Sequence, residues 1–168
     1  PEEIVQRQPF PGPGLGIRVI CAETVYKPSD TQQVVERLMT HQTDNIKTAL
    51  LPIQTVGLQG DDRTYAHLAA LSGKADWPTL FARAKEITDD ISNINRVAYI
   101  FGEPVEGFVD DITPTHVTAE SLAQLREADT LVNQWLVRHG LDVSLSQVPV
   151  ILFPVNFGKP GQHSIAIR

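Results

Sequence analysis

The chain has 168 residues, of which 42% are hydrophobic, and a formal net charge of −6 at neutral pH. This length suffices for one typical domain or two small ones with a buried core. Charges of both signs are interspersed and the balance is acidic, which argues against nonspecific binding to nucleic acid or anionic lipid, because both need a basic face.

The lone cysteine, Cys21, falls in an apolar stretch and has no second thiol to pair with. The sequence therefore predicts neither a disulfide framework nor a thiolate metal cluster, which fits a reducing cytoplasm. No apolar run approaches the roughly 18 residues that span a bilayer, and the N-terminus lacks the signature of a secretory signal. Because the chain starts on Pro1 without an initiator methionine, we expect a fragment of a longer protein.

Residues 7–18, with the sequence RQPFPGPGLGIR, are dense in proline and glycine. Proline fixes φ, and glycine alone visits positive φ without penalty, so the segment predicts a rigid turn that leaves backbone amides facing outward. Such a turn either is only a stiff connection into a strand over 16–21 or lets a flat or anionic ligand approach the main chain.

Strand patterns dominate the first half of the chain, and the two central ones are close enough to pair as a hairpin. The expected strands are 17–20, 50–58, 64–71 and 96–101. A helix of modest strength is expected within 29–45. A stronger helix begins after an N-cap at Asp76, with an apolar stripe of Leu80, Phe81, Ala84, Ile87 and Ile91.

The second half begins with residues 102–115, which are rich in Pro, Gly and Asp and are expected to form a linker or a surface loop. A helix capped by Thr118 runs to His139 and is closed by Gly140. Its expected inward residues are Leu122, Leu125, Ala128, Val132, Trp135 and Leu136. Further strands are expected at 148–155 and 164–167.

Two apolar strands with an internal proline, LLPI at 50–53 and ILFPV at 151–155, form a weak internal repeat. The chain is therefore predicted to be α+β, with two related small units in which helices pack on one face of a mixed or antiparallel sheet. The first unit follows the order β-α-β-β-α-β. The second stops without the helix and closing strand that the first unit has, so either the chain has been cut or something else covers that sheet.

Catalytic signatures are missing from the sequence. The five histidines are scattered without paired spacing, and there is no HExxH pattern, GxSxG elbow or phosphate loop. We therefore expect no metal site and no catalytic residue in this chain, which leaves recognition chemistry.

Residues 51–65, LPIQTVGLQGDDRTY, are similar over their whole length to the LPxxxVGxxGDxRxY stretch of the glutamine-hydrolysing GMP synthases. The segment 6–18 resembles the junction between the ATP pyrophosphatase and dimerization domains of that family, with Gln8 where the familiar motif has a histidine. The stretches 95–99 (NRVAY), 125–129 (LREAD) and 146–147 (SQ) resemble further signatures of these enzymes.

The resemblance covers nearly all the chain and is strongest to the long form of the enzyme, whose C-terminal region has two related subdomains. It implies that residues 1–15 end the pyrophosphatase domain, that 16–103 form one dimerization subdomain and that 104–168 form a second, incomplete one. The parent enzyme would be a cytoplasmic ligase of purine biosynthesis that aminates XMP to GMP with ATP and glutamine-derived ammonia.

The resemblance further implies that this portion forms the subunit interface and one wall of the XMP pocket. The corresponding residues are Pro9, Phe10, Pro11, Gly12, Pro13, Gly14, Asp61, Arg63 and Gln147. A carboxylate accepts from ring N–H or ribose hydroxyl groups, a glutamine amide both donates and accepts on a purine edge, and an arginine fork matches phosphate. The alternative is that Asp61 is a turn residue, Arg63 an exposed hairpin end and Gln147 a solvated loop residue.

Partners follow from the same resemblance. ATP and Mg²⁺ are assigned to the parent enzyme, and no cofactor is expected in this portion. The family's lysine and glutamate for XMP lie in a tail beyond Arg168, so we expect weak XMP binding or none by this chain alone. We also expect homodimers formed through surfaces around 51–58, and contacts with the remaining domains. The competing hypothesis is a pure self-association module without nucleotide binding.

Overall fold

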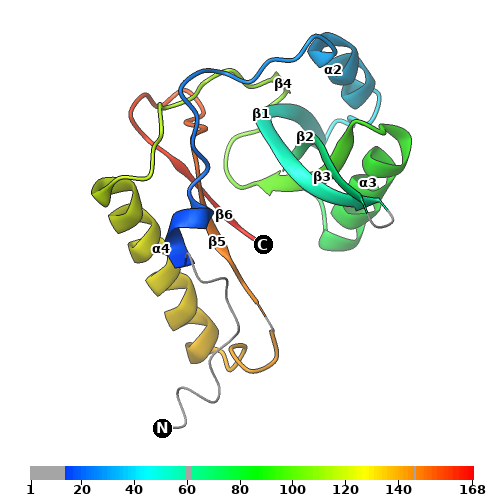
Figure 1. Ribbon diagram of the computed structural model, residues 1–168. Coiled ribbons are helices and arrows are strands. Elements are labelled where there is room, and N and C mark those ends of the chain that lie inside the picture. Colours follow the sequence, from blue (N-terminus) through cyan, green and yellow to red (C-terminus); the bar gives the residue numbers. More distant parts are fainter. Residues whose placement is uncertain (1–13, 60–61, 146) are drawn as a thin grey trace, which may run out of the picture. The chain divides into compact units, whose positions relative to one another are not determined.

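The computed structural model describes residues 14–59, 62–145 and 147–168, and the side chains of residues 58–64 lie outside that description. The predicted α+β class is confirmed: these residues form a four-stranded mixed sheet, a two-stranded sheet and three α-helices (Figure 1). They group into two compact units, 25–110 and a split unit that joins 14–24 to 111–168. These limits differ from the expected subdomains because residues 14–24 pair with the later segment.

The sheet of unit 25–110 has the strand order β3-β2-β1-β4. Strands β1 (Ile46–Gln59) and β2 (Asp62–Gly73) form the predicted antiparallel hairpin and extend beyond the expected bounds. Strands β3 (Ile94–Ile100) and β4 (Gly107–Phe108) lie at the two edges and run parallel to β2 and β1, respectively. The stretch 102–115 was expected to be a loop, and the strand β4 within it corrects that prediction.

Pro52 lies at an irregularity in the pairing of β1. The pairing of β1 with β2 shifts register between Leu51 and Gln54, around Pro52. Because proline has no N–H to give to a ladder, it is tolerated in a strand mainly at edges and bulges. The hairpin is therefore bent at the LLPI stretch that the sequence repeat singles out.

Helices α2 (Thr31–Met39) and α3 (Trp77–Asp90) supply the rest of this core. The predicted N-cap is confirmed, since the Asp76 side chain accepts a hydrogen bond from the Thr79 N–H at 2.9 Å. The core joins both helices to β1, β2 and β3 through Val34, Val35, Leu38, Ile46, Leu50, Ala69, Leu71, Leu80, Ile87, Ile91 and Ile94. Phe81 was expected in this core but is 70% exposed, where it contacts the ring of Trp77.

The split unit places α4 (Ala119–Arg138) beside strands β5 (Val150–Phe153) and β6 (Ser164–Ile167) (Figure 1). Thr118 caps α4 as predicted, in a capping box with Ser121. The two strands form an antiparallel pair.

Two predictions for the split unit are wrong. The expected strand at 17–20 is replaced by a 3₁₀ turn, η1 (Gly14–Arg18), followed by a single parallel bridge from Val19 to Leu152 of β5. The apolar pattern was read as strand, but only Val19 reaches a ladder, and Ile17 stays half exposed. Trp135 was expected to face inward on α4 and is also exposed.

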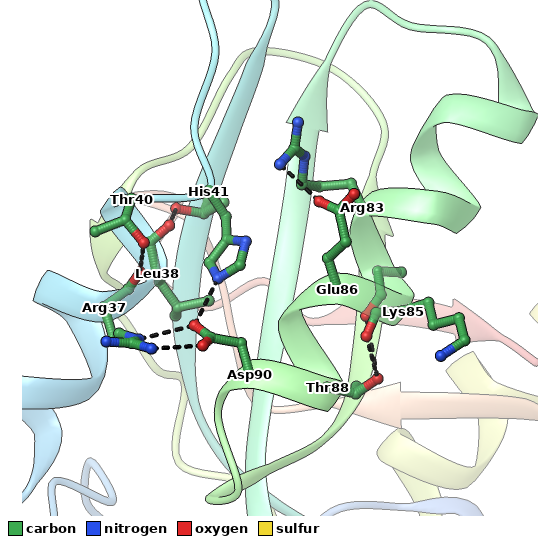
Figure 2. A network of polar contacts seen from close by, with 11 residues as sticks. Arg37, Leu38, Thr40, His41, Arg83, Lys85, Glu86, Thr88 and Asp90 are labelled. Atoms are coloured by element: carbon green, nitrogen blue, oxygen red, sulfur yellow. Dashed lines mark hydrogen bonds and ion pairs between the residues drawn. The ribbon is translucent and has the colours of Figure 1, made fainter.

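A polar network joins the ends of α2 and α3 (Figure 2). The Asp90 carboxylate accepts from Arg37 Nε at 2.8 Å and from Arg37 Nη2 at 2.5 Å, and His41 Nε2 lies 2.9 Å from the same carboxylate. The hydrogen bonds from Arg37 and then from His41 hold the pKa of Asp90 well below its ordinary value, against the opposing effect of burial. The ionised Asp90 thus links two helices that are far apart in sequence.

We predict that Asp90→Asn destabilises the protein at neutral pH and that this difference shrinks under acid. A carboxyl with a depressed folded-state pKa stabilises the protein above its unfolded pKa of about 4, and the contribution fades as pH falls towards the folded pKa. Urea midpoints between pH 7 and pH 3 measure the effect. Asp89→Asn is the matched control, because Asp89 pairs only along α3 with Lys85; a pH-independent loss in Asp90→Asn would contradict the linkage.

Candidate functional site

Only some of the residues predicted to form the nucleotide pocket lie in the described part of the chain, and these belong to two different units. Residues 9–13 and Asp61 lie outside the described part of the chain. The backbone of Arg63 lies in β2 opposite Leu58, near the end of the hairpin. Gly14 and Gln147 both belong to the split unit, whereas Arg63 belongs to unit 25–110.

The β1–β2 hairpin continues beyond the sheet as a two-stranded arm. Its pairing runs out to Gln59 and Asp62, but β2 pairs with β3 only from His67 to Ser72. The backbone of Asp62 and Arg63 lies at the end of the arm that the structure describes.

Side chains of the NRVAY stretch brace this arm. Asn95 Nδ2 donates to the carbonyl oxygen of Thr55 at 2.8 Å, and the Thr55 hydroxyl donates to Asn95 Oδ1. Arg96 donates from Nη2 and Nε to the carbonyl oxygen of Val56, at 3.0 and 3.2 Å. These bonds occupy carbonyl oxygens of β1 that would otherwise lie open on the arm, and they fix its direction relative to β3.

A second polar cluster lies at the base of the arm. His67 is buried, and its Nε2 lies 3.3 Å from both carboxylate oxygens of Asp30. Asp30 Oδ2 also accepts from Asn93 Nδ2 at 2.7 Å. Burial raises the pKa of Asp30, but the hydrogen bonds from Asn93 and His67 outweigh it and leave that pKa below its ordinary value. Nearby, Gln54 Nε2 donates to the Tyr26 hydroxyl at 2.7 Å. His67 and Gln54 are partners in the ladder at the point where the strand register shifts.

The proline- and glycine-rich residues 7–18, here called the Pro/Gly turn, end in η1, and η1 is anchored to α4 and β5. Arg18 Nη1 donates to Asp129 Oδ1 at 2.5 Å and lies 3.4 Å from the Val150 carbonyl oxygen. The side chains of this ion pair are only 11% and 25% exposed. Asp129 is the last residue of the LREAD stretch, so two of the recognised sequence signatures meet in one contact.

An apolar cluster lies under the same turn. Leu15 of η1 packs against the buried Val19, Leu125 and Leu152, which come from the turn, α4 and β5. Gly14 has φ of +60°, in the region that glycine adopts without strain, and a Cβ built on it would meet no atom within 4 Å. The positive φ of residue 14, and not a lack of space around it, therefore favours glycine at this position.

Gln147 lies in the loop between α4 and β5, with an exposed side chain. It precedes Val150, the residue whose carbonyl oxygen faces Arg18, by three positions. The loop with Gln147 and the turn with Gly14 are thus both attached to the α4–β5 pair.

Sequence reasoning missed the partners in these contacts. The pairs Arg18–Asp129 and Asn95–Thr55 join residues that lie 111 and 40 positions apart. The only signal was indirect: Asp129, Asn95 and Arg96 belong to stretches that resemble family signatures, but a signature does not name the residue it contacts.

Other site types have no support in the described ranges. No group of three or more His, Cys, Asp or Glu side chains that could hold a metal ion occurs in 14–59, 62–145 or 147–168. Over the same residues, no helix is both long enough and apolar enough to cross a bilayer.

No family model matches the chain. The GMP synthase (glutamine-hydrolysing) of Dictyostelium discoideum is 37% identical over 211 residues, which cover 99% of this chain and 29% of the relative. A probable GMP synthase of Caenorhabditis elegans is 30% identical over 235 residues, with coverages of 100% and 32%. One from Leptospira interrogans is 33% identical over 168 residues, with coverages of 99% and 27%.

The structure of the chain is α+β. The chain spans under a third of the length of each of these relatives, so it corresponds to a part of longer proteins. One of these relatives is named a GMP synthase and two are named probable GMP synthases. The chain is similar along its whole length to part of each of them.

We predict that Arg18→Ala lowers the free energy of unfolding by about 1.5–3 kcal/mol, the usual value of a hydrogen bond to a charged group. The loss arises because Asp129 keeps its partial burial without its partner. Urea denaturation checks it, with Arg126→Ala on the exposed side of α4 as the matched control. Asp129→Ala and the double variant complete a cycle, and additive losses would contradict a direct Arg18–Asp129 interaction.

Proposed function

We propose that this chain is the portion of a GMP synthase that joins subunits and contributes one wall of the XMP pocket. The observation that carries the proposal is sequence similarity to GMP synthases over 99–100% of the chain. The whole enzyme would be an ATP-dependent ligase that uses glutamine-derived ammonia to aminate XMP. Its reactive centres would lie on parts of the protein other than those described here.

We propose that the Pro/Gly turn and Gln147 form one part of the pocket wall. Both Gly14, at the end of the turn, and Gln147 are attached to the α4–β5 pair of the split unit, which is held by the ion pair of Arg18 and Asp129. An exposed amide on a loop beside a rigid turn has the chemistry to read a purine edge, since it donates and accepts at once. The sequence predicts that backbone amides of residues 9–14 face outward, and we propose that they complement this contact.

Asp61 and Arg63 are proposed as a second contribution, and the backbone of Arg63 lies in the arm of unit 25–110. The braces from Asn95 and Arg96 support this role, because they fix the base of an element that would otherwise pivot about the Pro52 bulge. In the proposal, Arg63 donates hydrogen bonds to a phosphate, and Asp61 accepts hydrogen bonds from ribose hydroxyl groups.

Subunit contact is proposed to involve the same arm, around residues 51–58. On one of its faces Val56 pairs across the strands with Tyr65, and these side chains are 39% and 67% exposed. An exposed apolar pair on a projecting ribbon favours contact with a second copy. This feature alone also supports the rival hypothesis of a self-association module that binds no nucleotide.

We predict that Gln147→Ala in the full-length enzyme raises the KM for XMP roughly 2- to 10-fold, as the loss of one hydrogen bond implies. Glutamine hydrolysis and the oligomeric state by sedimentation should not change. The control is Gln134→Ala, which removes an exposed amide from the C-terminal half of α4.

An unchanged KM for XMP, together with intact dimers, would favour the self-association hypothesis over the pocket wall. Loss of the dimer in Gln147→Ala would contradict the separation of the two roles.

A further inference from the structure

Residues 25–30, here called the strap, lead into α2 and are tied to the base of the arm by two side chains. Tyr26 accepts a hydrogen bond on its hydroxyl oxygen from Gln54 Nε2 at 2.7 Å. Asp30 faces His67, whose Nε2 lies 3.3 Å from each carboxylate oxygen. The strap therefore contacts both strands of the arm at its base, β1 through Gln54 and β2 through His67.

The strap meets the sheet where both of its ladders are irregular. The pairing of β1 with β2 shifts register where Gln54 pairs with His67, and the pairing of β2 with β3 shifts between His67 and Leu68. The His67 side chain is only 6% exposed at this point. Asn93, which precedes β3, accepts the His67 N–H on its carbonyl oxygen at 2.8 Å and donates from its side chain to Asp30. Asp30 thus ties an irregular point of the sheet to the start of α2.

Asp30 is also the N-cap residue of α2, but its side chain is not used for capping. Aspartate is among the best N-caps, because its carboxylate accepts from N–H groups of the first turn and complements the positive end of the helix dipole. In the described first turn of α2, the Asp30 side chain makes no capping hydrogen bond. Asp76 and Thr118, the N-caps of α3 and α4, have ψ of 158° and 167°, and both side chains cap. Asp30 instead has ψ of 0°, and its carboxylate binds elsewhere.

A turn holds the backbone of Asp30 in this conformation. The N–H and the hydroxyl of Thr31 both donate to the carbonyl oxygen of Pro28, at 3.2 and 2.7 Å. The φ of −87° and ψ of 0° at Asp30 match the third residue of a type I turn. Rotation of this ψ into the extended range would open the turn and bring the carboxylate to the N–H groups of Gln32 and Gln33. One backbone rotation therefore exchanges two alternative sets of donors for the same carboxylate.

We propose that the strap is a conformational latch with a docked and a released state. In the docked state, which the structure shows, Asp30 holds His67 and Asn93. In the released state Asp30 caps α2, Tyr26 leaves Gln54, and the base of the arm around His67 opens to solvent. Release is less costly than the loss of the docked contacts alone, because the carboxylate has hydrogen-bond donors in both states.

The latch acts on one side of the arm. The braces from Asn95 and Arg96 bond β3 to the carbonyl oxygens of Thr55 and Val56 without the strap, so they stay in place in both states. Release therefore loosens the β2 side of the arm base and leaves the β1 side held. The proposal rests on contacts within unit 25–110 and holds whether or not the arm binds a nucleotide.

Amide exchange in the first turn of α2, measured by NMR on the whole chain, distinguishes the two states. Release frees the Thr31 N–H, whose exchange should accelerate, and caps the Gln33 N–H, whose exchange should slow. His67→Phe removes the imidazole and keeps a ring in the buried site, so we expect roughly fivefold changes in opposite directions at these amides. His41→Phe is the matched control, because it removes an imidazole–carboxylate contact beyond the other end of α2 and should change neither rate.

Two substitutions of Asp30 separate capping from a simple loss of contact. Serine caps a helix about as well as aspartate but is shorter and carries no charge to hold His67, so Asp30→Ser should accelerate exchange at Thr31 and slow it at Gln33. Asp30→Ala should accelerate exchange at Thr31 without slowing it at Gln33. Asn93→Ala, at an exposed position, should reproduce the pattern of His67→Phe with roughly twofold changes, and it replaces that variant if His67→Phe does not fold.

Three results would overturn the latch. Faster exchange at both Thr31 and Gln33 in His67→Phe and Asn93→Ala would show that the contact only stabilises the start of α2. Unchanged exchange at both amides in these variants would show that the strap stays docked without the contact. Equal exchange of the Gln33 amide in Asp30→Ser and Asp30→Ala would show that no capped state forms.

Discussion

The split unit depends on contacts between residues 14–24 and 111–168, which are separated in the sequence by the whole of unit 25–110. Arg18 pairs with Asp129, Val19 bridges to Leu152 and Ala22 exchanges backbone hydrogen bonds with Thr115, at 3.1 and 2.8 Å. Closing so long a loop has an entropic cost that grows slowly with its length, so a few partly buried contacts and a small apolar cluster can offset it. The same contacts hold the end of the Pro/Gly turn against α4 and β5.

Elements specified by neighbouring residues were predictable from the sequence. The caps at Asp76 and Thr118 need only a side-chain acceptor beside the first turn, and the β1–β2 hairpin needs two strand patterns with a short break. Elements decided by distant partners were not predictable. The apolar run at 17–20 reads as a strand, but only Val19 reaches the ladder of β5; Trp135 fits an inward stripe, but the face it belongs to is not covered in the described residues.

The candidate site shows the same division. Motif resemblance suggested Gln147, Arg63 and the Pro/Gly turn as candidates, because short stretches carry that signal. It could not indicate that Arg18 and Asp129 hold the turn, or that Asn95 and Arg96 brace the arm, since these contacts follow from the fold. Motif order also failed to show that residues 14–24 belong with 111–168, which places Gly14 in the same unit as Gln147.

Native-state hydrogen exchange on the whole chain tests this arrangement most directly. The amides of Ile20, Ala22 and Thr115 are bonded within the split unit, to Leu152, Thr115 and Ala22 respectively. Asp129→Ala should therefore accelerate exchange at these amides together with those of β5, and leave the central amides of β2 unchanged. Equal acceleration in both units, or none at Ile20 and Ala22, would contradict a split unit closed by its own long-range contacts.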